Sequence, residues 1–462
     1  MRAVTFSLSA CLMGAAVLAA PAAFGAKADR AWQSAAGAAD ETVFALTGDS
    51  IINRRLSVYE APGKDAMFGL IRGADAAFTN FETLIHPYNM PGAAESGGTY
   101  MASPPFVAKE LEWAGFDLLG LANNHGNDYG AEGLMMTVDA LSKTDLIYAG
   151  AGSNLAFARA PGYLDTRRGR VALISTSSSF PSAIGAGAQR KDLPGRPGIN
   201  PLGHEETYSV TQQTFDSLKP MGRAMKVDGQ DTLRIGNATF AVGATVGVVS
   251  KANARDLAEL AASVRDARQQ ADWVMVSVHS HEYKTPSDPT QPADFLVEFA
   301  HAMIDAGADV VVGHGPHILR GIEVYKGKPI FYSMANFIFE NDLVAFQPAE
   351  NYEKTELPES ALPSDYYSKR SKNDTVGFPA GRKYWQSVVA EVIYKDDRTL
   401  KGIKLHPVAL GFGRSRPQRG QPYPATGAEA AQILEDITKL SEPYGVKITV
   451  KDGVGYASWK TD

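Results

Sequence analysis

Apolar runs that end in polar residues, separated by segments of helical periodicity, recur along most of this chain of 462 residues. The run TVFALTGDSI (residues 42–51) contains Gly-Asp near its end. The helical segment FVAKELEWAGF (106–116) leads into a second run, DLLGLANN. A later helical segment leads into DVVVGHGPHIL (309–319) in the same way. Alternation of this kind is typical of α/β proteins with a substantially parallel core sheet. We therefore expect an α/β fold.

The N-terminal segment, residues 1–25, has the layout of a secretory signal. Arg2 is followed by an apolar stretch and then by small residues. An uncleaved membrane anchor is the alternative, but Ser7, Ser9 and Pro21 interrupt the apolar stretch. Export to the periplasm or the outside of the cell is therefore favoured over membrane anchoring.

The composition excludes several kinds of chemistry. The single cysteine, Cys11, lies inside the predicted signal, and its LSAC context resembles a lipobox except that the apolar core continues after the cysteine. Cleavage would leave no cysteine, which excludes disulfides, thiol nucleophiles and cysteine-ligated zinc. The net charge of -6 and the pI of about 5.9 leave no basic surplus for a phosphate backbone. This argues against nucleic acid as a partner.

Polar side chains gather where the predicted strands end. Asp49 and Glu82 each follow an apolar run, and an Asn-Asn-His triplet follows the run LLGLA. Taken singly, each has an ordinary structural explanation, such as a turn, a helix cap or a solvated face. Ligands of open parallel sheets bind at the carboxyl ends of the strands, so the joint recurrence favours a binding site. Five of the nine histidines lie in such positions: His125, His279, His281, His314 and His317.

The chemistry that fits this set is a pair of divalent cations. Two cations about 3.5–4 Å apart can hold a hydroxide against a phosphoryl or carbonyl centre. Such a site needs a carboxylate that touches both cations, with oxygen and imidazole ligands around it. Carboxylate, amide and imidazole side chains supply these ligands for Mn, Fe or Zn. The sequence therefore predicts two divalent cations.

Six segments resemble signature blocks of the capsule-synthesis CapA family of the calcineurin-like metallophosphatase superfamily, which is associated with poly-γ-glutamate. These segments are GDSI, NFETLI, NNHGNDYGAEG, RPGINPL, VHSHEY and GHGPHILRGIEVYKGKPIFYSMANFIF. They lie in order within the stretch from Val43 to Gly413. The resemblance implies a layered α/β/β/α sandwich over residues 40–413, with a loop-rich insertion or lid at 341–385. Residues 414–462 are expected to form a C-terminal extension packed on the same domain.

The resemblance also assigns the metal ligands in two groups. Asp49 and His317 would bind the first cation, and Glu82 would bridge both cations. The remaining ligands of the second cation would be Asn124, His279 and His314.

A catalytic pair follows from the same motifs. His125 would act as general acid toward the leaving group. Asp128 and Asn123 could orient its imidazole and fix its tautomer, which makes His125 and Asp128 the predicted catalytic residues. Asn123 is also a candidate to contact the substrate.

Two positions depart from the family pattern. The superfamily places a histidine two residues after the first aspartate, but this chain has Ile51 there, which leaves the first cation with one ligand fewer. Many family members carry Trp-Gly where this chain has Ser280-His281. His281 could add a ligand, or it could contact the substrate together with Glu282. In the loop PGRPGINPL, Arg196 could engage a carboxylate or phosphate.

Three functions are compatible with these residues. The first is an exported metallohydrolase that cuts a phosphoester or a γ-glutamyl amide. The second is a non-catalytic factor in synthesis or export of poly-γ-glutamate, within a membrane-associated complex. The third is a cell-surface binding module with a vestigial site. The substrate would be a small molecule or an anionic polymer, and a polymer would need a cleft lined by cationic groups. The candidates for that lining are Arg54, Arg55, Arg196 and Arg320.

Overall fold

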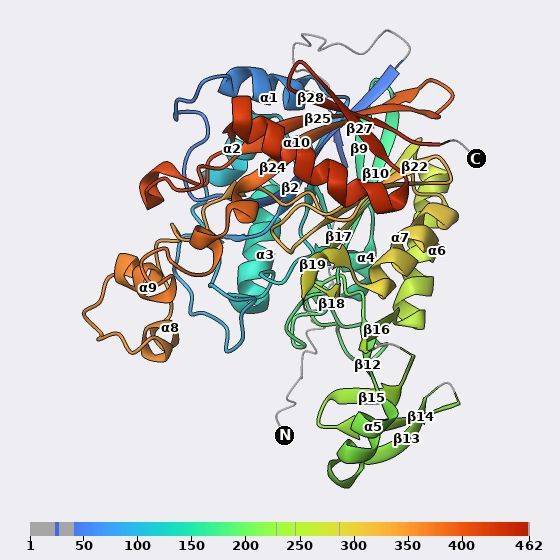
Figure 1. Ribbon diagram of the computed structural model, residues 1–462. Helices are drawn as coiled ribbons and strands as arrows, with labels where there is room; N and C mark the ends of the chain where they lie inside the picture. The colour runs from blue at the N-terminus through green and yellow to red at the C-terminus, as the bar shows by residue number, and fades with distance from the viewer. Residues whose placement is uncertain (1–23, 27–40, 228, 245, 286, 461–462) are drawn as a thin grey trace, which may run out of the picture.

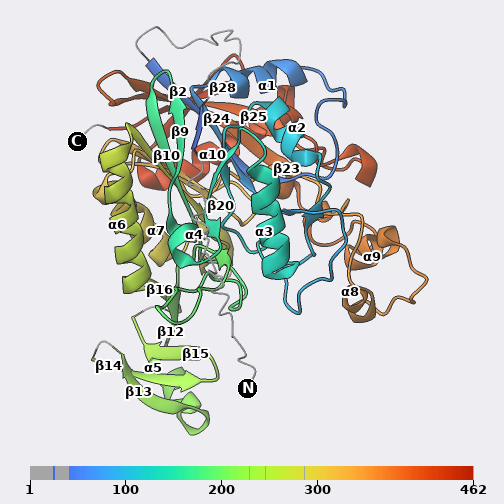
Figure 2. The same ribbon diagram turned by 180° about the vertical axis from the view of Figure 1, so that it is seen from behind.

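The computed structural model describes residues 24–26, 41–227, 229–244, 246–285 and 287–460. Two large sheets form the body of the molecule, and helices cover their outer faces (Figures 1 and 2). This confirms the predicted α/β/β/α sandwich. Residues 1–23, which carry most of the predicted export signal together with Cys11, lie outside the described residues.

The larger sheet is parallel on one side of β2 and antiparallel on the other. Its parallel strands, in spatial order, are β2 (Glu41–Ile51), β3 (Ala76–Phe81), β6 (Leu118–Gly120) and β7 (Ile147–Ala149). β23 (Asn336–Phe339) also pairs with β2. The antiparallel side continues with β24 (Gln386–Lys395), β25 (Leu400–Ala409), β28 (Val454–Ser458) and β27 (Lys447–Lys451). The C-terminal residues therefore add two strands to this sheet.

The second sheet has a parallel centre as well. Its strands, in spatial order, are β1 (Phe24–Ala26), β9 (Gly162–Thr166), β10 (Gly169–Ser177), β17 (Trp273–His279), β20 (Val310–His314), β22 (Lys328–Phe331) and β21 (Ile322–Tyr325). β10, β17, β20 and β22 are parallel neighbours. β21 and β22 form an antiparallel hairpin around Lys326-Gly327.

Apolar side chains fill three layers. Because successive side chains of a strand point to opposite faces, Phe44 and Leu46 of β2 lie in the cluster between the sheets, whereas Val43 and Ala45 lie in the outer cluster. The inner cluster also receives Met275 of the second sheet. α10 (Gly427–Ser441) adds its buried side chains to this inner cluster.

Helices complete the outer layers. The outer face of the larger sheet is covered by α1 (Lys64–Gly73), α2 (Val107–Ala114) and α3 (Gly130–Leu141). α6 (Ala254–Gln270) and α7 (Asp294–Ala306) lie side by side on the outer face of the second sheet in both views (Figures 1 and 2). Within the described residues, no helix combines the length and the apolar composition needed to cross a membrane.

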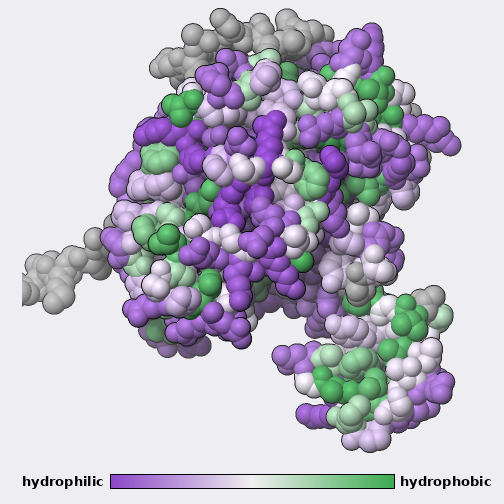
Figure 3. Space-filling model, turned by 60° about the vertical axis from the view of Figure 1, so that its left-hand side comes forward, coloured by the Kyte–Doolittle hydropathy of each residue, from purple (hydrophilic) through white to green (hydrophobic). Residues whose placement is uncertain are grey.

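A small β unit, residues 204–252, projects from the body (Figures 1 and 2). Its strands, in spatial order, are β13 (Arg223–Val227), β14 (Gln230–Ile235), β15 (Ala238–Val242), β12 (His204–Val210) and β16 (Gly247–Ala252), with α5 (Gln212–Leu218) beside them. The unit begins and ends at one place, because His204 pairs with Ala252 and the N–H of Asn253 donates to the carbonyl of Gly203 at 2.7 Å. Figure 3 shows hydrophobic residues gathered on its surface.

The predicted insertion at residues 341–385 carries short helices and no strand among its residues, all of which the structure describes. It contains α8 (Ala349–Lys354) and α9 (Pro363–Arg370), followed by 3₁₀ turns at Phe378–Ala380 and Arg382–Trp385. α8 and α9 stand out from the side of the body (Figure 1). The segment leads from β23 into β24, so its two ends lie next to the carboxyl end of β2.

Candidate metal centre

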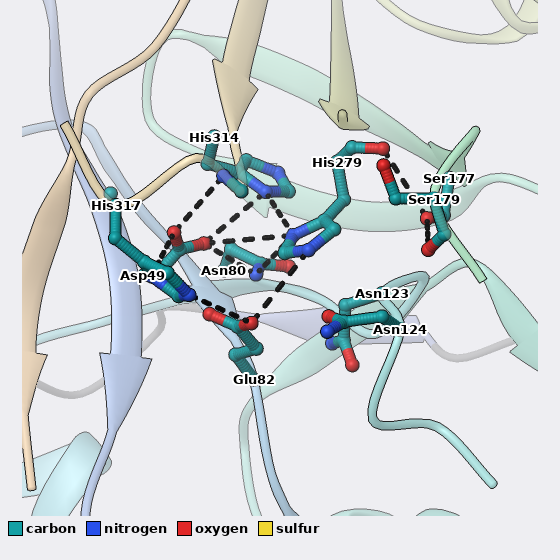
Figure 4. A network of polar contacts seen from close by, with 12 residues as sticks. Asp49, Asn80, Glu82, Asn123, Asn124, Ser177, Ser179, His279, His314 and His317 are labelled. Carbon is teal, nitrogen blue, oxygen red and sulfur yellow. Dashed lines mark hydrogen bonds and ion pairs between the residues drawn. The ribbon is translucent and has the colours of Figure 1, made fainter. Parts of the chain in front are cut away.

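The carboxyl ends of the two sheets bring the predicted residues together. Asp49 of β2 is the register partner of Asn80 of β3, and His279 of β17 is the register partner of His314 of β20. Figure 4 shows Asp49, Glu82, His279, His314 and His317 converging on one space. Residues separated by up to 268 positions thus form one cluster, as the strand-end pattern predicts.

A local irregularity of β2 aims Asp49 at this space. The register of β2 against β3 shifts between Leu46 and Asp49. A Cβ atom on Gly48 would lie 1.9 Å from the carbonyl oxygen of Ala335, so only glycine fits there. The same carbonyl accepts the N–H of Asp49 at 2.8 Å. Bulges of this kind re-aim a side chain, which explains the Gly-Asp pair at the end of the apolar run.

Asp49 lies among three imidazoles and is fully buried. Its Oδ1 is 3.4 Å from His314 Nδ1 and 3.7 Å from His279 Nδ1, and its Oδ2 is 3.5 Å from His317 Nδ1. Its carboxylate also accepts Asn80 Nδ2 at 2.8 Å. Burial acts to raise the pKa of Asp49, but hydrogen bonds from His314 and His317 outweigh it and hold that pKa well below its ordinary value. Asp49 is therefore an anion in the folded protein.

Glu82 is buried without any hydrogen-bond partner on either carboxylate oxygen. Its Oε1 is 3.7 Å from His279 Nε2, 3.8 Å from His317 Nε2 and 3.8 Å from His125 Nε2. Burial raises the pKa of Glu82 well above its ordinary value, and the charges of Asp49 and Asp128 add to the shift. A buried carboxylate without hydrogen-bond partners destabilises the fold unless a bound cation or a proton neutralises its charge.

The donor set fits divalent cations. Besides Glu82, the amide oxygens of Asn80 and Asn124 are buried without a partner, so oxygen acceptors face the same region as the imidazoles (Figure 4). Three groups have ligand atoms within 4.8 Å of one another: Asp49, His279 and His314; Glu82, His279 and His281; and Asp49, Glu82 and His317. Nitrogen and oxygen ligands without sulfur suit Mn, Fe or Zn.

The grouping differs in one respect from the assignment that the family resemblance implies. Asp49, Glu82 and His317 form a group, which matches the predicted first cation with Glu82 as the bridge. His314 directs Nδ1 at Asp49, and its Nε2 lies 2.7 Å from Ser277 Oγ. The resemblance instead places His314 with Asn124 on the second cation. Asn124 keeps Oδ1 free while its Nδ2 donates to the carbonyl of Gly97 at 3.0 Å.

His125 is held in one orientation beside Glu82. Its Nδ1 lies 2.6 Å from Asp128 Oδ2, and its backbone N–H donates to Asn123 Oδ1 at 3.1 Å. Asn123 in turn donates to the carbonyl of Phe81 at 2.9 Å. The two residues predicted to orient His125 therefore contact it, and the free Nε2 faces the cluster.

Two of the predicted substrate-contacting residues, Glu282 and Arg196, already have hydrogen-bond partners within the protein. Glu282 accepts hydrogen bonds from Ser178, Ser179 and Ser280, so its carboxylate is already engaged. Arg196 donates twice to the carbonyl of Gly185, at 2.8 and 3.2 Å. Both roles remain predictions.

The arginines proposed to line a cleft have structural partners. Arg54 donates to Glu340 at 2.8 Å, and Arg55 pairs with Glu110 at 3.0 Å. Arg320 is completely buried, so this candidate does not line an open cleft. Its guanidinium donates to backbone carbonyls of Pro289 and Glu282 instead.

Two asparagines were not among the predicted ligands. Asn80 lies on the strand face of Glu82, two positions away, and contacts both Asp49 and His279. The period of two along a strand could have identified it. Asn336 Oδ1 accepts a hydrogen bond from His317 Nδ1 at 2.7 Å. Its position depends on the pairing of β23 with β2, which the sequence does not indicate.

A cavity of about 250 Å³ lies beside the centre. Its wall includes Phe339 and Phe378, whose ring centroids lie 5.4 and 5.2 Å from that of His317. Most of its other lining residues, Tyr367, Arg370 and Tyr384 among them, belong to the segment 341–385. The inserted segment therefore contributes the wall of a cavity next to a candidate ligand.

Comparisons with known proteins show the family to which the chain belongs. A family model described as "Bacterial capsule synthesis protein PGA_cap" matches residues 43–341, a range that contains every candidate ligand. An uncharacterized protein of Sinorhizobium fredii is 36% identical over 447 residues, which cover 93% of this chain and 95% of that relative.

Two relatives carry functional names. The "Capsule biosynthesis protein CapA" of Bacillus anthracis is 27% identical over 311 residues, 65% of this chain and 60% of that protein. A "Probable polyglutamine synthesis accessory protein" of Mycobacterium tuberculosis is 28% identical over 220 residues, 47% of this chain and 44% of that protein. Together with the family match, these similarities show that the chain belongs to the bacterial capsule synthesis family PGA_cap, the CapA family that its motifs resemble.

Proposed function

We propose that this protein is a metal-dependent hydrolase that acts on a phosphoester or a γ-glutamyl amide. The observation that carries the proposal is the position of His125. Its imidazole is bound to Asp128 through Nδ1 and faces Glu82 through Nε2 at 3.8 Å. A binding site needs no such proton-carrying pair beside its cations.

The residues divide the chemistry between them. Asp49, Glu82 and His317 would hold one of two cations, and His279 would contribute to the other. Divalent cations, when bound, lower the pKa of a water and polarise a phosphoryl or carbonyl oxygen. His125 Nε2 gives a proton to the departing alkoxide or amine, because Asp128 occupies Nδ1 and leaves Nε2 as the exchangeable position. The cavity beside His317 offers room for the rest of the substrate.

A second candidate is a non-catalytic role in the synthesis or export of an anionic polymer such as poly-γ-glutamate. The names of the relatives favour it, since one is called a capsule biosynthesis protein and another a probable polyglutamine synthesis accessory protein. In that role the cations would hold polymer carboxylates, and a membrane-associated synthesis complex would be the partner. His125 would then be dispensable.

Metal quantitation combined with one variant separates the two roles. Purified protein grown with Mn, Fe and Zn is expected to carry about two equivalents of metal and to turn over a member of a panel of phosphoesters and γ-glutamyl peptides. His125→Ala should lower kcat by about 10²–10⁴-fold, the contribution of a general acid, and leave the metal bound. His301→Ala, a histidine of α7 that pairs with Glu323 outside the centre, is the matched control. Full metal content with no turnover of any substrate would favour the polymer-binding role.

We also propose that the protein is exported, because Arg2 and the apolar stretch that follows have the layout of a secretory signal. Mass spectrometry of the protein isolated from the periplasmic and external fractions should find a mature N-terminus at Ala26, so that Phe24 and Gly25 of β1 would belong to the precursor only. Protein found only in the cytoplasm with residues 1–25 attached would contradict this.

A further inference from the structure

His281 lies directly against the metal centre. Its Nε2 is 3.0 Å from Nε2 of His279, and the ring centroids are 4.9 Å apart. His281, His279 and Glu82 form one of the three groups whose ligand atoms lie within 4.8 Å. Ile51, at the end of β2, is buried in the outer apolar cluster and offers no ligand.

The spacing of these atoms suits a shared cation. Metal–nitrogen bonds of about 2.0–2.1 Å place two nitrogens of one coordination sphere roughly 2.9–3.4 Å apart. The distance between the two Nε2 atoms is 3.0 Å, and Glu82 Oε1 lies 3.7 Å from His279 Nε2. A hydrogen bond between two neutral imidazoles would give a similar nitrogen distance, but it would leave both oxygens of Glu82 unpartnered, as they are now.

The backbone around His281 is fixed from several sides. Its N–H donates to Ser179 Oγ at 2.6 Å. The next residue, Glu282, is held by the hydroxyls of Ser178, Ser179 and Ser280 at 2.7–2.9 Å. These contacts tie the loop after β17 to the end of β10. The direction of the His281 side chain is therefore set by the fold rather than by contact with solvent.

Arg320 donates hydrogen bonds to the backbone of the same loop. Its Nε donates to the carbonyl of Pro289 at 3.0 Å, and its Nη2 donates to the carbonyls of Glu282 at 2.9 Å and His281 at 3.4 Å. The side chain is completely buried, and no ion pair within 4.0 Å joins it to a carboxylate of the described residues. A buried guanidinium is costly to desolvate, and these hydrogen bonds together with the negative charges of Glu282 and Asp288 offset that cost.

We propose that His281 is a ligand of the cation held by Glu82 and His279, and that Arg320 is the positioning residue that sets the His281 loop. The added imidazole gives that cation three protein ligands: Glu82, His279 and His281. This inference rests on the metal centre in the proposed function, but not on the reaction that the centre performs.

Metal binding by the metal-stripped protein tests this without reference to turnover. Isothermal titration with Zn²⁺ and Mn²⁺, together with elemental analysis after dialysis, counts the sites and their affinities. His281→Ala is expected to weaken one of two sites by more than about 100-fold, since direct ligands exceed the 10–100-fold effect of outer partners. Substitution with Co²⁺ should show a changed visible spectrum at that site only. His301→Ala is the control and should bind both cations normally.

The positioning role needs its own variants. Arg320→Met should lower the affinity of the same site by about 10–100-fold, and Arg320→Lys should restore part of it, because an ammonium can still donate to a carbonyl. Thermal unfolding of each variant reports whether the fold is kept, and His281→Ala alone decides the ligand assignment if the Arg320 variants do not fold.

Two results would overturn the inference: both cations bound by His281→Ala with wild-type affinity, or no cation bound by the wild-type protein. A wild-type protein that binds two cations and hydrolyses nothing would defeat the proposed function and leave this inference standing.

Discussion

At the carboxyl ends of the two sheets, charged and polar side chains are buried, whereas on the projecting unit of residues 204–252 apolar side chains are exposed. Glu82 is fully buried with no partner on either oxygen. In the unit, Met221 and Val246 are 68% and 72% exposed. An unsatisfied buried polar group lowers the free energy of unfolding by about 1–3 kcal/mol. Apolar burial in the sandwich must therefore offset the cost of the unsatisfied groups in the centre.

The unit has a small apolar core of its own. Its buried apolar side chains include Leu233, Phe215 and Ala241. It meets the body mainly at its base, where His204 stacks on Phe295 with ring centroids 4.3 Å apart. None of the candidate ligand groups includes a residue of the unit, so we expect the centre to depend on the body alone. The unit is a separately stabilised appendage whose loss should leave the centre intact.

Glu82→Gln tests how much stability the buried charge of the centre costs. Of the four changes, we expect it to have the largest effect. Removing the bridging charge should abolish the binding of at least one cation, with an affinity loss beyond the about 100-fold that outer partners cost. The metal-free variant should unfold at a higher temperature than metal-free wild type, because a neutral amide is cheaper to bury. Calorimetry with and without Mn²⁺ measures both effects. Glu132→Gln, on the exposed face of α3, is the control.

Leu233→Ala tests whether the unit is stabilised separately. Truncation of this buried leucine should cost about 2–5 kcal/mol, confined to the strands of the unit. Hydrogen exchange of peptides from residues 223–242 should accelerate, while metal content and turnover stay at wild-type values. Val249→Ala, at a 56% exposed position of the same unit, should change neither. Loss of metal from Leu233→Ala would show that the two regions are coupled.

Asp128→Asn sharpens the account of the centre. The substitution removes the charge that holds His125 Nδ1 and should lower kcat by about 10–100-fold, as loss of an orienting partner does. Metal content should not change, because Asp128 belongs to none of the ligand groups. Asp139→Asn, an exposed aspartate of α3, is the control. An equal loss in both variants would remove Asp128 from the mechanism.

Excision of the unit should have the smallest effect. Glu206 pairs with Ser250 across β12 and β16, so an Asn-Gly turn can replace residues 207–249 and close the hairpin. Metal affinity and turnover of small substrates should stay within about twofold of wild type, a free-energy difference below 0.5 kcal/mol. A larger loss would break the separation drawn between the two regions.

Much of the sandwich can be predicted from the sequence because its elements bury long apolar runs. In α6 (Ala254–Gln270) the buried residues Leu260, Val264 and Ala267 recur at helical spacing, which a sequence pattern can indicate. The strands of the projecting unit are different. β12 reads HEETYSV and β13 reads RAMKV, and most of their side chains are exposed or half-buried. Without a buried face there is no period for a sequence pattern to reveal.

The features of the metal centre also divide into those that the sequence predicts and those that it does not. Asp49, Glu82 and His279 converge because parallel strands share an edge, and the sequence shows where each strand ends. Which nitrogen of His279 faces which carboxylate depends on side-chain packing, and so does the pairing of His314 with Asp49. The burial of Arg320 under the His281 loop depends on contacts between segments about 40 residues apart. No sequence period encodes these details.

Anomalous diffraction from crystals grown with Mn²⁺ tests the central claim most directly. The account predicts a strong peak within about 2.0–2.6 Å of ligand atoms of Asp49, Glu82 and His317. Well-ordered side chains at those positions with no anomalous peak between them would contradict it.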